Sequence, residues 1–167
     1  MKTIPLTQGQ VALVDDEDFA RFGHLKWFAH WDPKAKRFYA HRNKFKDEPG
    51  PAIQILHRKI MGVTDPRVKV DHKNHDTLDC RRRTNLRACT NAQNMQNRSG
   101  LDAKNTSKMR GVSWHKKAGK WVAQICVKGE RIYLGLFIDK IMAASVYAAA
   151  NRKHFGEFGG NINGGER

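Results

Sequence analysis

The first fifty residues place hydrophobic side chains in short runs separated by turn-forming residues. Alternation with a period of two is typical of strands, and apolar residues three or four apart are typical of a helix face. These patterns predict strands over residues 9–14, 27–29 and 38–41 and a short helix over 15–25. The acidic run is better explained as capping and charging the helix N-terminus, where carboxylates are favoured, than as a cation site. A Pro-Gly-Pro break ends this β-rich extension, residues 1–50.

The next segment, residues 51–98, has a different order of elements. We expect a helix over 53–61, brief strands over 68–70 and 85–87, and a helix that begins after Thr90 and carries Asn91, Asn94 and Asn97. Thr90 is the expected N-cap because a threonine hydroxyl accepts from the first N–H groups of a helix. Residues 99–108 are small and polar without periodicity, which indicates a linker.

Residues 109–160 predict a second module. Strands are expected over 110–114, 121–127 and 131–137, followed by an alanine-rich helix from Lys140 to Phe155 that Asp139 caps and Gly156 ends. Alternation places one set of side chains against the helix: Trp121, Ala123, Ile125, Val127, Ile132, Leu134 and Leu136. The fold class is therefore α+β, with a C-terminal three-stranded antiparallel sheet packed on one helix.

Charge indicates the kind of partner. The chain has 31 Lys and Arg against 16 Asp and Glu, a net charge of +15, and both halves are basic. A polyanion is the simplest partner, because Lys and Arg placed on phosphates release condensed counterions; a merely soluble basic protein is the alternative. Three cysteines without a CxxC pair argue against a disulfide framework. No signal peptide or membrane run is evident, so we expect a cytoplasmic protein with no membrane partner.

One constellation carries candidate chemistry: Asp71-His72, then Asn85-Leu86-Arg87, then Thr90 and Asn94. Carboxylate and amide oxygens are hard ligands that suit Mg²⁺ or Mn²⁺. A divalent cation neutralises charge on a phosphate that is being hydrolysed, and an imidazole can take a proton from water. These elements resemble the HNH endonuclease family, and within it the phage and intron-borne homing enzymes, over about residues 53–98. The resemblance implies a ββα-metal (His-Me finger) catalytic hairpin.

The resemblance also implies a role for each residue. Asp71 and Asn94 would bind one Mg²⁺ or Mn²⁺ ion, His72 would be the general base, and Asn85 would fix the loop across the hairpin. A third protein ligand is not evident. His57 and Asn97 are possible supporting residues, with structural roles as the alternative.

Arginines near this hairpin are candidate phosphate ligands, since guanidinium groups bind phosphate through two N–H donors. The candidates are Arg81, Arg82, Arg83, Arg87 and Arg98. Cys80 and Cys89 lie at the hairpin, but two cysteines without CxxC do not make a four-cysteine site, so no structural zinc is expected.

The C-terminal module resembles the APETALA/ethylene-response-factor (ERF) type of DNA-binding domain, which also occurs fused to phage HNH enzymes. The matching segments are 110–112, 119–125, 131–137 and 143–156. The resemblance implies a sheet in the DNA major groove, with these contacts: Arg110, Trp114, Lys116, Lys117, Gln124, Arg131 and Tyr133. Cys126 stands where relatives often have arginine, which puts base readout at that position in doubt.

Together these features predict a metal-dependent, homing-type endonuclease of double-stranded DNA, encoded by a phage or mobile element of a bacterial host. One active site per chain indicates nicking by a monomer or double-strand cleavage by a homodimer. Two alternatives remain: a non-catalytic, sequence-specific DNA-binding regulator, and a protein that binds or cleaves RNA.

Overall fold

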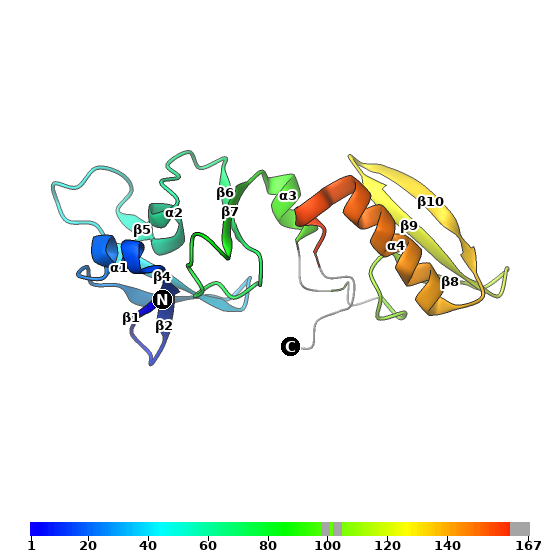
Figure 1. The fold of residues 1–167 in the computed structure, drawn as a ribbon, viewed down its shortest axis with the longest axis horizontal. Helices are drawn as coiled ribbons and strands as arrows, with labels where there is room; N and C mark the ends of the chain where they lie inside the picture. The colour runs from blue at the N-terminus through cyan, green and yellow to red at the C-terminus, as the bar shows by residue number, and fades with distance from the viewer. Residues whose placement is uncertain (98–100, 102–104, 161–167) are drawn as a thin grey trace. The chain divides into compact units, whose positions relative to one another are not determined.

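The structure is a computed structural model that describes residues 1–97, 101 and 105–160. The chain divides into two compact units, Met1–Asn94 and Met95–Arg167, which can be followed by colour in Figure 1. The fold is α+β, with small antiparallel sheets and few helices. Among the described residues, no helix has the length and apolar character needed to cross a membrane.

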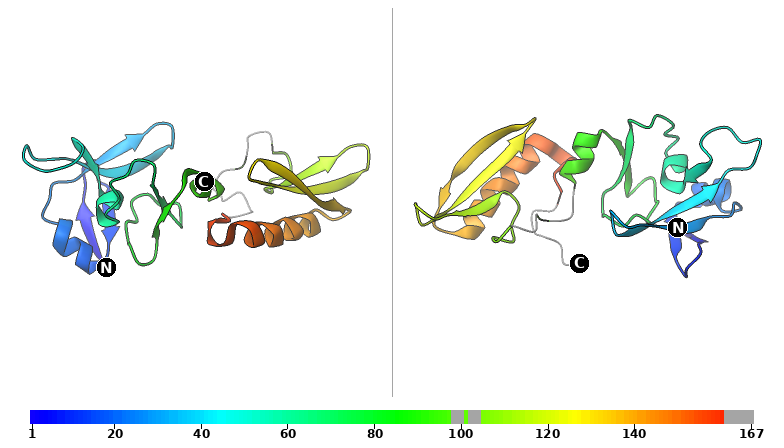
Figure 2. Two further views of the ribbon diagram at one scale, coloured as in Figure 1. Left: turned by 90° about the horizontal axis from the view of Figure 1, so that it is seen from above. Right: turned by 180° about the vertical axis from the view of Figure 1, so that it is seen from behind.

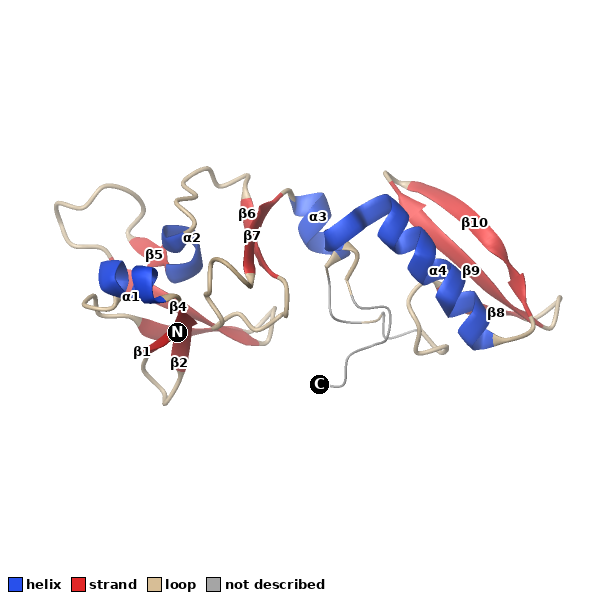
Figure 3. Cartoon of the chain, in the orientation of Figure 1, coloured by secondary structure: helices blue, strands red, loops and turns tan. Residues whose placement is uncertain are grey.

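The N-terminal unit contains three small antiparallel sheets (Figure 3). The elements in order are β1 (Lys2–Pro5), β2 (Val11–Val14), α1 (Asp16–Phe22), β3 (Phe28–Asp32), β4 (Arg37–Asn43), β5 (Ile53–Ile55), α2 (Leu56–Ile60), β6 (Lys69–His72) and β7 (Leu86–Cys89). Strand β1 pairs with β2, β4 lies between β3 and β5, and β6 pairs with β7. A short helix, α3 (Asn91–Gln96), follows β7 and contains the division between the units.

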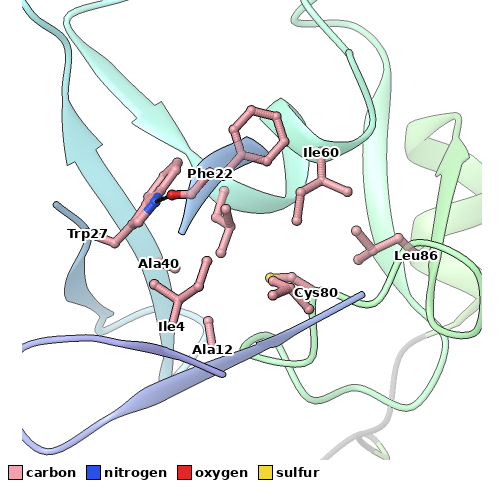
Figure 4. Packing of buried hydrophobic residues seen from close by; sticks show 10 residues of the cluster. Ile4, Ala12, Phe22, Trp27, Ala40, Ile60, Cys80 and Leu86 are labelled. Atoms are coloured by element: carbon pink, nitrogen blue, oxygen red, sulfur yellow. Dashed lines mark hydrogen bonds between the residues drawn. The ribbon is translucent and has the colours of Figure 1, made fainter. Parts of the chain in front are cut away.

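The core of the N-terminal unit lies between β1, β2, α1, α2 and the loop after β6 (Figure 4). Ile4 and Leu56 are fully buried there, and the Trp27 indole donates to the Phe22 carbonyl oxygen at 3.0 Å. The backbone of Leu13 bonds to Leu78 and Cys80, both at 2.8 Å. Those bonds attach the loop between β6 and β7 to strand β2, so β2 fixes the position of that loop.

Two features of the N-terminal unit differ from the sequence prediction. Residues 53–55 form strand β5 and not the first turn of a helix, so the helix is limited to Leu56–Ile60. The β-branched Ile53 and Ile55 favour a strand, and β4 offers an edge with which they pair, His41 opposite Ile55. Strand β1 was not predicted, because its four residues carry too short a pattern.

The C-terminal unit confirms the predicted three strands and one helix. Its elements are β8 (Val112–His115), β9 (Lys120–Val127), β10 (Glu130–Phe137), α4 (Lys140–Phe155) and the 3₁₀ turn η1 (Gly156–Phe158). The sheet order is β10-β9-β8, and α4 covers one face of it (Figures 1 and 2). Asp139 caps α4 as predicted, accepting from the Met142 amide at 2.7 Å.

The prediction that Leu136, near the C-terminal end of β10, faces the core is wrong. The register shifts between Tyr133 and Gly135, and one extra residue in a strand reverses the faces of all residues beyond it. Leu136 therefore lies on the open face, where it is exposed, while Phe137 packs with Leu134 against the core.

Part of the predicted linker is ordered. Residues 105–108 form a turn around Ser107, which is buried and whose hydroxyl lies 2.7 Å from the Val112 carbonyl oxygen. Asn105 donates to the Met109 carbonyl oxygen at 2.8 Å. These bonds connect the turn to strand β8. The predicted linker positions 99, 100 and 102–104 lie outside the described residues.

Candidate active site

Asp71 and His72 end strand β6, where they lie opposite Arg87 and Leu86 of β7. Because successive side chains of a strand point to opposite faces, the Asp71 carboxylate and the His72 imidazole lie on opposite faces of the hairpin. Both residues are buried. The structure thus brings two of the predicted site residues to one end of the hairpin and gives each a different environment.

The Asp71 carboxylate is paired with Arg87. Nε of Arg87 lies 2.8 Å and Nη2 2.7 Å from Oδ2 of Asp71. Both side chains are 8% exposed, so the charges meet in a poorly solvated place where a guanidinium is the stabilising partner. Arg87, a predicted DNA contact, therefore has an internal carboxylate partner.

His72 packs against a second buried histidine. The ring centroids of His57 and His72 are 4.9 Å apart with the ring planes at 90°, and Tyr39 contacts His57 in turn at 5.9 Å. Burial lowers the pKa of His72 to about 4, against the raising effect of Asp71, Asp76 and Asp79. Burial also lowers the pKa of His57 well below its ordinary value. Both imidazoles are therefore uncharged at neutral pH, and an uncharged ring can accept a proton.

Asn85 connects the two ends of the loop between β6 and β7. Its side-chain Oδ1 accepts from the Asn74 amide at 2.9 Å, and its Nδ2 donates to the Asp79 carbonyl oxygen at 2.6 Å. Its backbone oxygen accepts from the Lys73 amide at 3.0 Å. A buried amide with both ends bonded to backbone fixes the loop that follows His72.

Asn94 lies on α3, whose start is fixed by Thr90. The Thr90 hydroxyl accepts from the Gln93 amide at 3.2 Å, and the Gln93 side chain accepts from the Thr90 amide at 2.8 Å. This reciprocal capping box confirms the predicted N-cap. Asn94 is half-buried. Asn97 comes after the end of the helix, is buried, and lies where a side chain on Gly160 would clash with its backbone.

A divalent ion would have few protein ligands at this site. Among residues 1–97, 101 and 105–160, no group of three or more His, Cys, Asp or Glu is placed to hold a metal. Asp71 and Asn94, the ligands predicted from the sequence, would supply one carboxylate and one amide oxygen. Such a sparse, oxygen-only set suits a hard ion that keeps several waters and takes further oxygens from a phosphate.

Arg81, Arg82 and Arg83 each contact a carboxylate of the same unit. Arg81 binds Asp79 through Nε at 2.7 Å and Nη2 at 2.6 Å. The other two reach the acidic start of α1, where both contact Glu17. This acidic segment makes no side-chain cap for its helix; it binds the arginines of the loop. Of the three, Arg83 is the most exposed.

The open face of the C-terminal sheet carries several of the predicted DNA contacts. Tyr133 lies opposite Gln124 and Arg131 opposite Cys126 on neighbouring strands, and Tyr133, Arg131 and Cys126 are exposed. Lys116 and Lys117 are exposed in the β8–β9 turn.

Two other predicted DNA contacts lie elsewhere in this unit. Trp114 shares the helix-side face with Trp121, its partner across the strands, and packs on it at 5.0 Å between ring centroids. Arg110 is half-buried and donates to the Gln96 carbonyl oxygen at 3.0 Å. Arg98 lies outside the described residues.

A family model matches the segment that contains this hairpin. Residues 61–96, which include β6, the loop, β7 and α3, match the model of an HNH endonuclease family, HNH_3. Comparison with curated proteins and with solved structures gave no match. The match supports an HNH nuclease domain, a class of hydrolases that act on DNA and generally use a divalent metal.

Two contacts of the site were not anticipated from the sequence. The sequence predicts Arg87 as a DNA contact, whereas its position on β7, two residues after Asn85, places it opposite Asp71. The contact between His57 and His72 joins α2 to β6 across fifteen residues of sequence. Hydrophobic periodicity does not predict a contact between side chains of two separate elements. The only signal in the sequence was that several histidines occur near the site.

Proposed function

We propose that this protein is a metal-dependent endonuclease that hydrolyses phosphodiester bonds in double-stranded DNA. The observation that carries the proposal is the end of the β6–β7 hairpin, where Asp71 and His72 lie next to each other within the segment that matches the HNH family. The non-catalytic regulator keeps the DNA-binding surface but does not account for Asp71, His72, Asn85 and Asn94 occurring together in the segment that matches the HNH family.

Each residue has a part in the reaction. Asp71 and Asn94 would hold the divalent ion, which would neutralise charge on the scissile phosphate and on the leaving oxygen. His72 accepts a proton from the attacking water, whose oxygen bonds to phosphorus as the bond to the 3′ oxygen breaks. Asn85 fixes the loop behind His72, and Arg87 orients the Asp71 carboxylate.

The C-terminal sheet binds the duplex in this proposal. Its open face presents Tyr133, Arg131 and Gln124, which combine an aromatic ring, a cation and an amide. Arginine and amide side chains read base edges in the major groove, and lysines of the β8–β9 turn bind phosphates. A catalytic hairpin joined to a separate DNA-binding sheet is the organisation expected of a homing-type enzyme that nicks one strand, with Mg²⁺ or Mn²⁺ as its ion.

Metal-dependent plasmid cleavage tests the proposal. Supercoiled plasmid incubated with the full chain should convert to the nicked form in Mg²⁺ or Mn²⁺ and remain intact in EDTA. Asp71→Asn should abolish conversion, whereas Asp65→Asn, which changes a carboxylate in an ion pair with the exposed Arg67, should cleave like the parent. Conversion that continues in EDTA, or that Asp71→Asn leaves unchanged, would contradict the proposal. Cleavage of RNA in preference to duplex DNA at one salt concentration would support the alternative substrate.

A further inference from the structure

His57 occupies a position that the proposed chemistry leaves unexplained. It is 7% exposed and comes second in α2, a helix of five residues whose Leu56 and Ile60 are both part of the core. These two anchors determine where the His57 ring can lie. That ring is directed at His72, with 4.9 Å between centroids and perpendicular planes.

The His57 ring also contacts the β3–β4–β5 sheet, through Tyr39 of β4. Tyr39 contacts the His57 ring at 5.9 Å between centroids with planes at 62°. Tyr39 is half-buried, and its strand also carries His41, which stacks on His30 at 4.5 Å. The His57 ring therefore lies between a sheet that does not belong to the hairpin and the ring of His72.

This arrangement restricts rotation of the His72 imidazole about χ2. An imidazole rotates about χ2 in broad, weakly separated wells, so strand β6 alone does not fix the direction of its ring nitrogens. An edge-to-face contact between aromatic rings favours one relative orientation. A ring held perpendicular to His72 supplies that preference.

We propose that His57 is a positioning residue that fixes the orientation of the His72 imidazole for proton transfer. The inference rests on the proposed nuclease function. His57 does not touch the reacting atoms in this account; it acts through His72. A misplacement of about 1 Å at a reacting group costs about 10²-fold in rate, so loss of the perpendicular ring should lower kcat and leave DNA binding unchanged.

The test compares two replacements that fill the same space. His57→Leu keeps an apolar side chain but no ring, and His57→Phe keeps an aromatic ring. Ile60→Val, a mild change in the buried core of the same helix, controls for loosened packing. For each full-length variant, single-turnover plasmid cleavage gives the rate of the chemical step, fluorescence anisotropy at fixed salt gives DNA affinity, and thermal unfolding gives stability.

His57→Leu should lower the cleavage rate by about 10- to 100-fold with DNA affinity and KM within twofold of the parent. His57→Phe should recover the rate to within about threefold, because the perpendicular ring remains. Ile60→Val should cleave like the parent even if its melting temperature falls as far as that of His57→Leu. A parental rate in His57→Leu, or an equal loss of rate in Ile60→Val, would overturn the assignment.

A spectroscopic measurement separates this inference from the proposed function. The ring protons of His72 should shift in the NMR spectrum of His57→Leu and return toward their parental positions in His57→Phe, without DNA or metal. If the parent fails to cleave DNA, the proposed function fails, and the NMR comparison still decides on the contact. Unchanged His72 resonances in His57→Leu would reject the positioning role whatever the activity.

Discussion

Arg87 binds the carboxylate of Asp71 across the β6–β7 strand pair, with two nitrogens within 2.8 Å of the same oxygen. The pair has two consequences. It satisfies a buried negative charge before any cation arrives, and it directs the carboxylate that we propose as a metal ligand. A bound ion and the guanidinium would then share one carboxylate.

Removal of Arg87 should therefore destabilise the protein. Arg87→Gln leaves the Asp71 charge buried without its cation, which typically costs about 3–5 kcal/mol of unfolding free energy. Arg67→Gln, in an ion pair whose arginine is largely exposed, should cost much less, because water screens that pair. Urea unfolding in EDTA measures both. Equal, small losses in the two variants would show that the buried pair contributes nothing special.

Asn85 should control the order of the loop after His72. Asn85→Ala removes the acceptor of the Asn74 amide and the donor to the Asp79 carbonyl oxygen, at a cost of about 1–3 kcal/mol for each buried group left without a partner. Hydrogen exchange of the Asn74 amide should accelerate. Asn43→Ala, at an exposed position of β4, provides the control. If the Asn74 amide in Asn85→Ala exchanges as slowly as in the parent, Asn85 does not fix the loop after His72.

Stability should fall as the solution is acidified below neutral pH. Burial lowers the pKa of His41 and of His72 to about 4 in the folded state, whereas an unfolded histidine has a pKa near 6.5. The unfolded chain thus binds more protons, so stability is fully present above about pH 6.5 and is lost progressively toward pH 4.

Thermal unfolding of the metal-free protein between pH 7.5 and 5 measures this dependence. His41→Phe should weaken the pH dependence, because the unfolded chain then has one fewer group to protonate. His154→Phe, at an exposed position of α4, should leave the slope as in the parent. A melting temperature that does not change from pH 7.5 to 5 would contradict the burial of these histidines.

The open face of the C-terminal sheet should account for much of the DNA affinity. Tyr133→Ala and Arg131→Ala should each cost about 1–3 kcal/mol of binding free energy, and Arg131→Ala should also reduce the salt dependence of binding. Met142 on α4 is as exposed as Tyr133, at 62%, so Met142→Ala is a matched control expected to bind like the parent. Fluorescence anisotropy over a salt series measures all three. Equal DNA affinity of Tyr133→Ala and Met142→Ala would show that the DNA does not bind to the open face of this sheet.

Gly111 illustrates a constraint that only the structure reveals. Its φ is +70°, and a Cβ at this position would lie 2.1 Å from the Tyr147 ring. Gly119 has a similar φ of +60° with open space around it, so Gly119→Ala should cost only the backbone strain of about 1–2 kcal/mol. Gly111→Ala should cost clearly more, because the buried Tyr147 must also move. Urea unfolding compares the two, and equal costs would contradict the close packing.

Local patterns predicted the elements that have strong periodicity or caps. The helix after Asp139 and the three C-terminal strands lie where alternation and capping residues put them, and Thr90 caps α3. The sequence predicts the wrong face for Leu136 because the bulge between Tyr133 and Gly135 depends on the pairing between strands. Strand β5 was missed because its partner, β4, is distant in the chain.

The candidate site was predictable in its residue types and not in its contacts. Asp71, His72 and Asn85 could be found from their order and spacing, which the family match also covers. The partners of these residues come from elements brought together by folding, as with His57 and His72. The partners of Arg82 and Arg83 could not be assigned either, because Glu17 on α1 lies more than sixty residues earlier.

Cleavage by a His72→Ala variant tests the central claim most directly. We predict that supercoiled plasmid in Mg²⁺ is nicked by the parent and that His72→Ala loses at least about 10²-fold in rate, the usual contribution of a general base. The affinity of the variant for the same DNA should remain within twofold of the parent at equal salt. A variant that nicks the plasmid as fast as the parent would contradict the account.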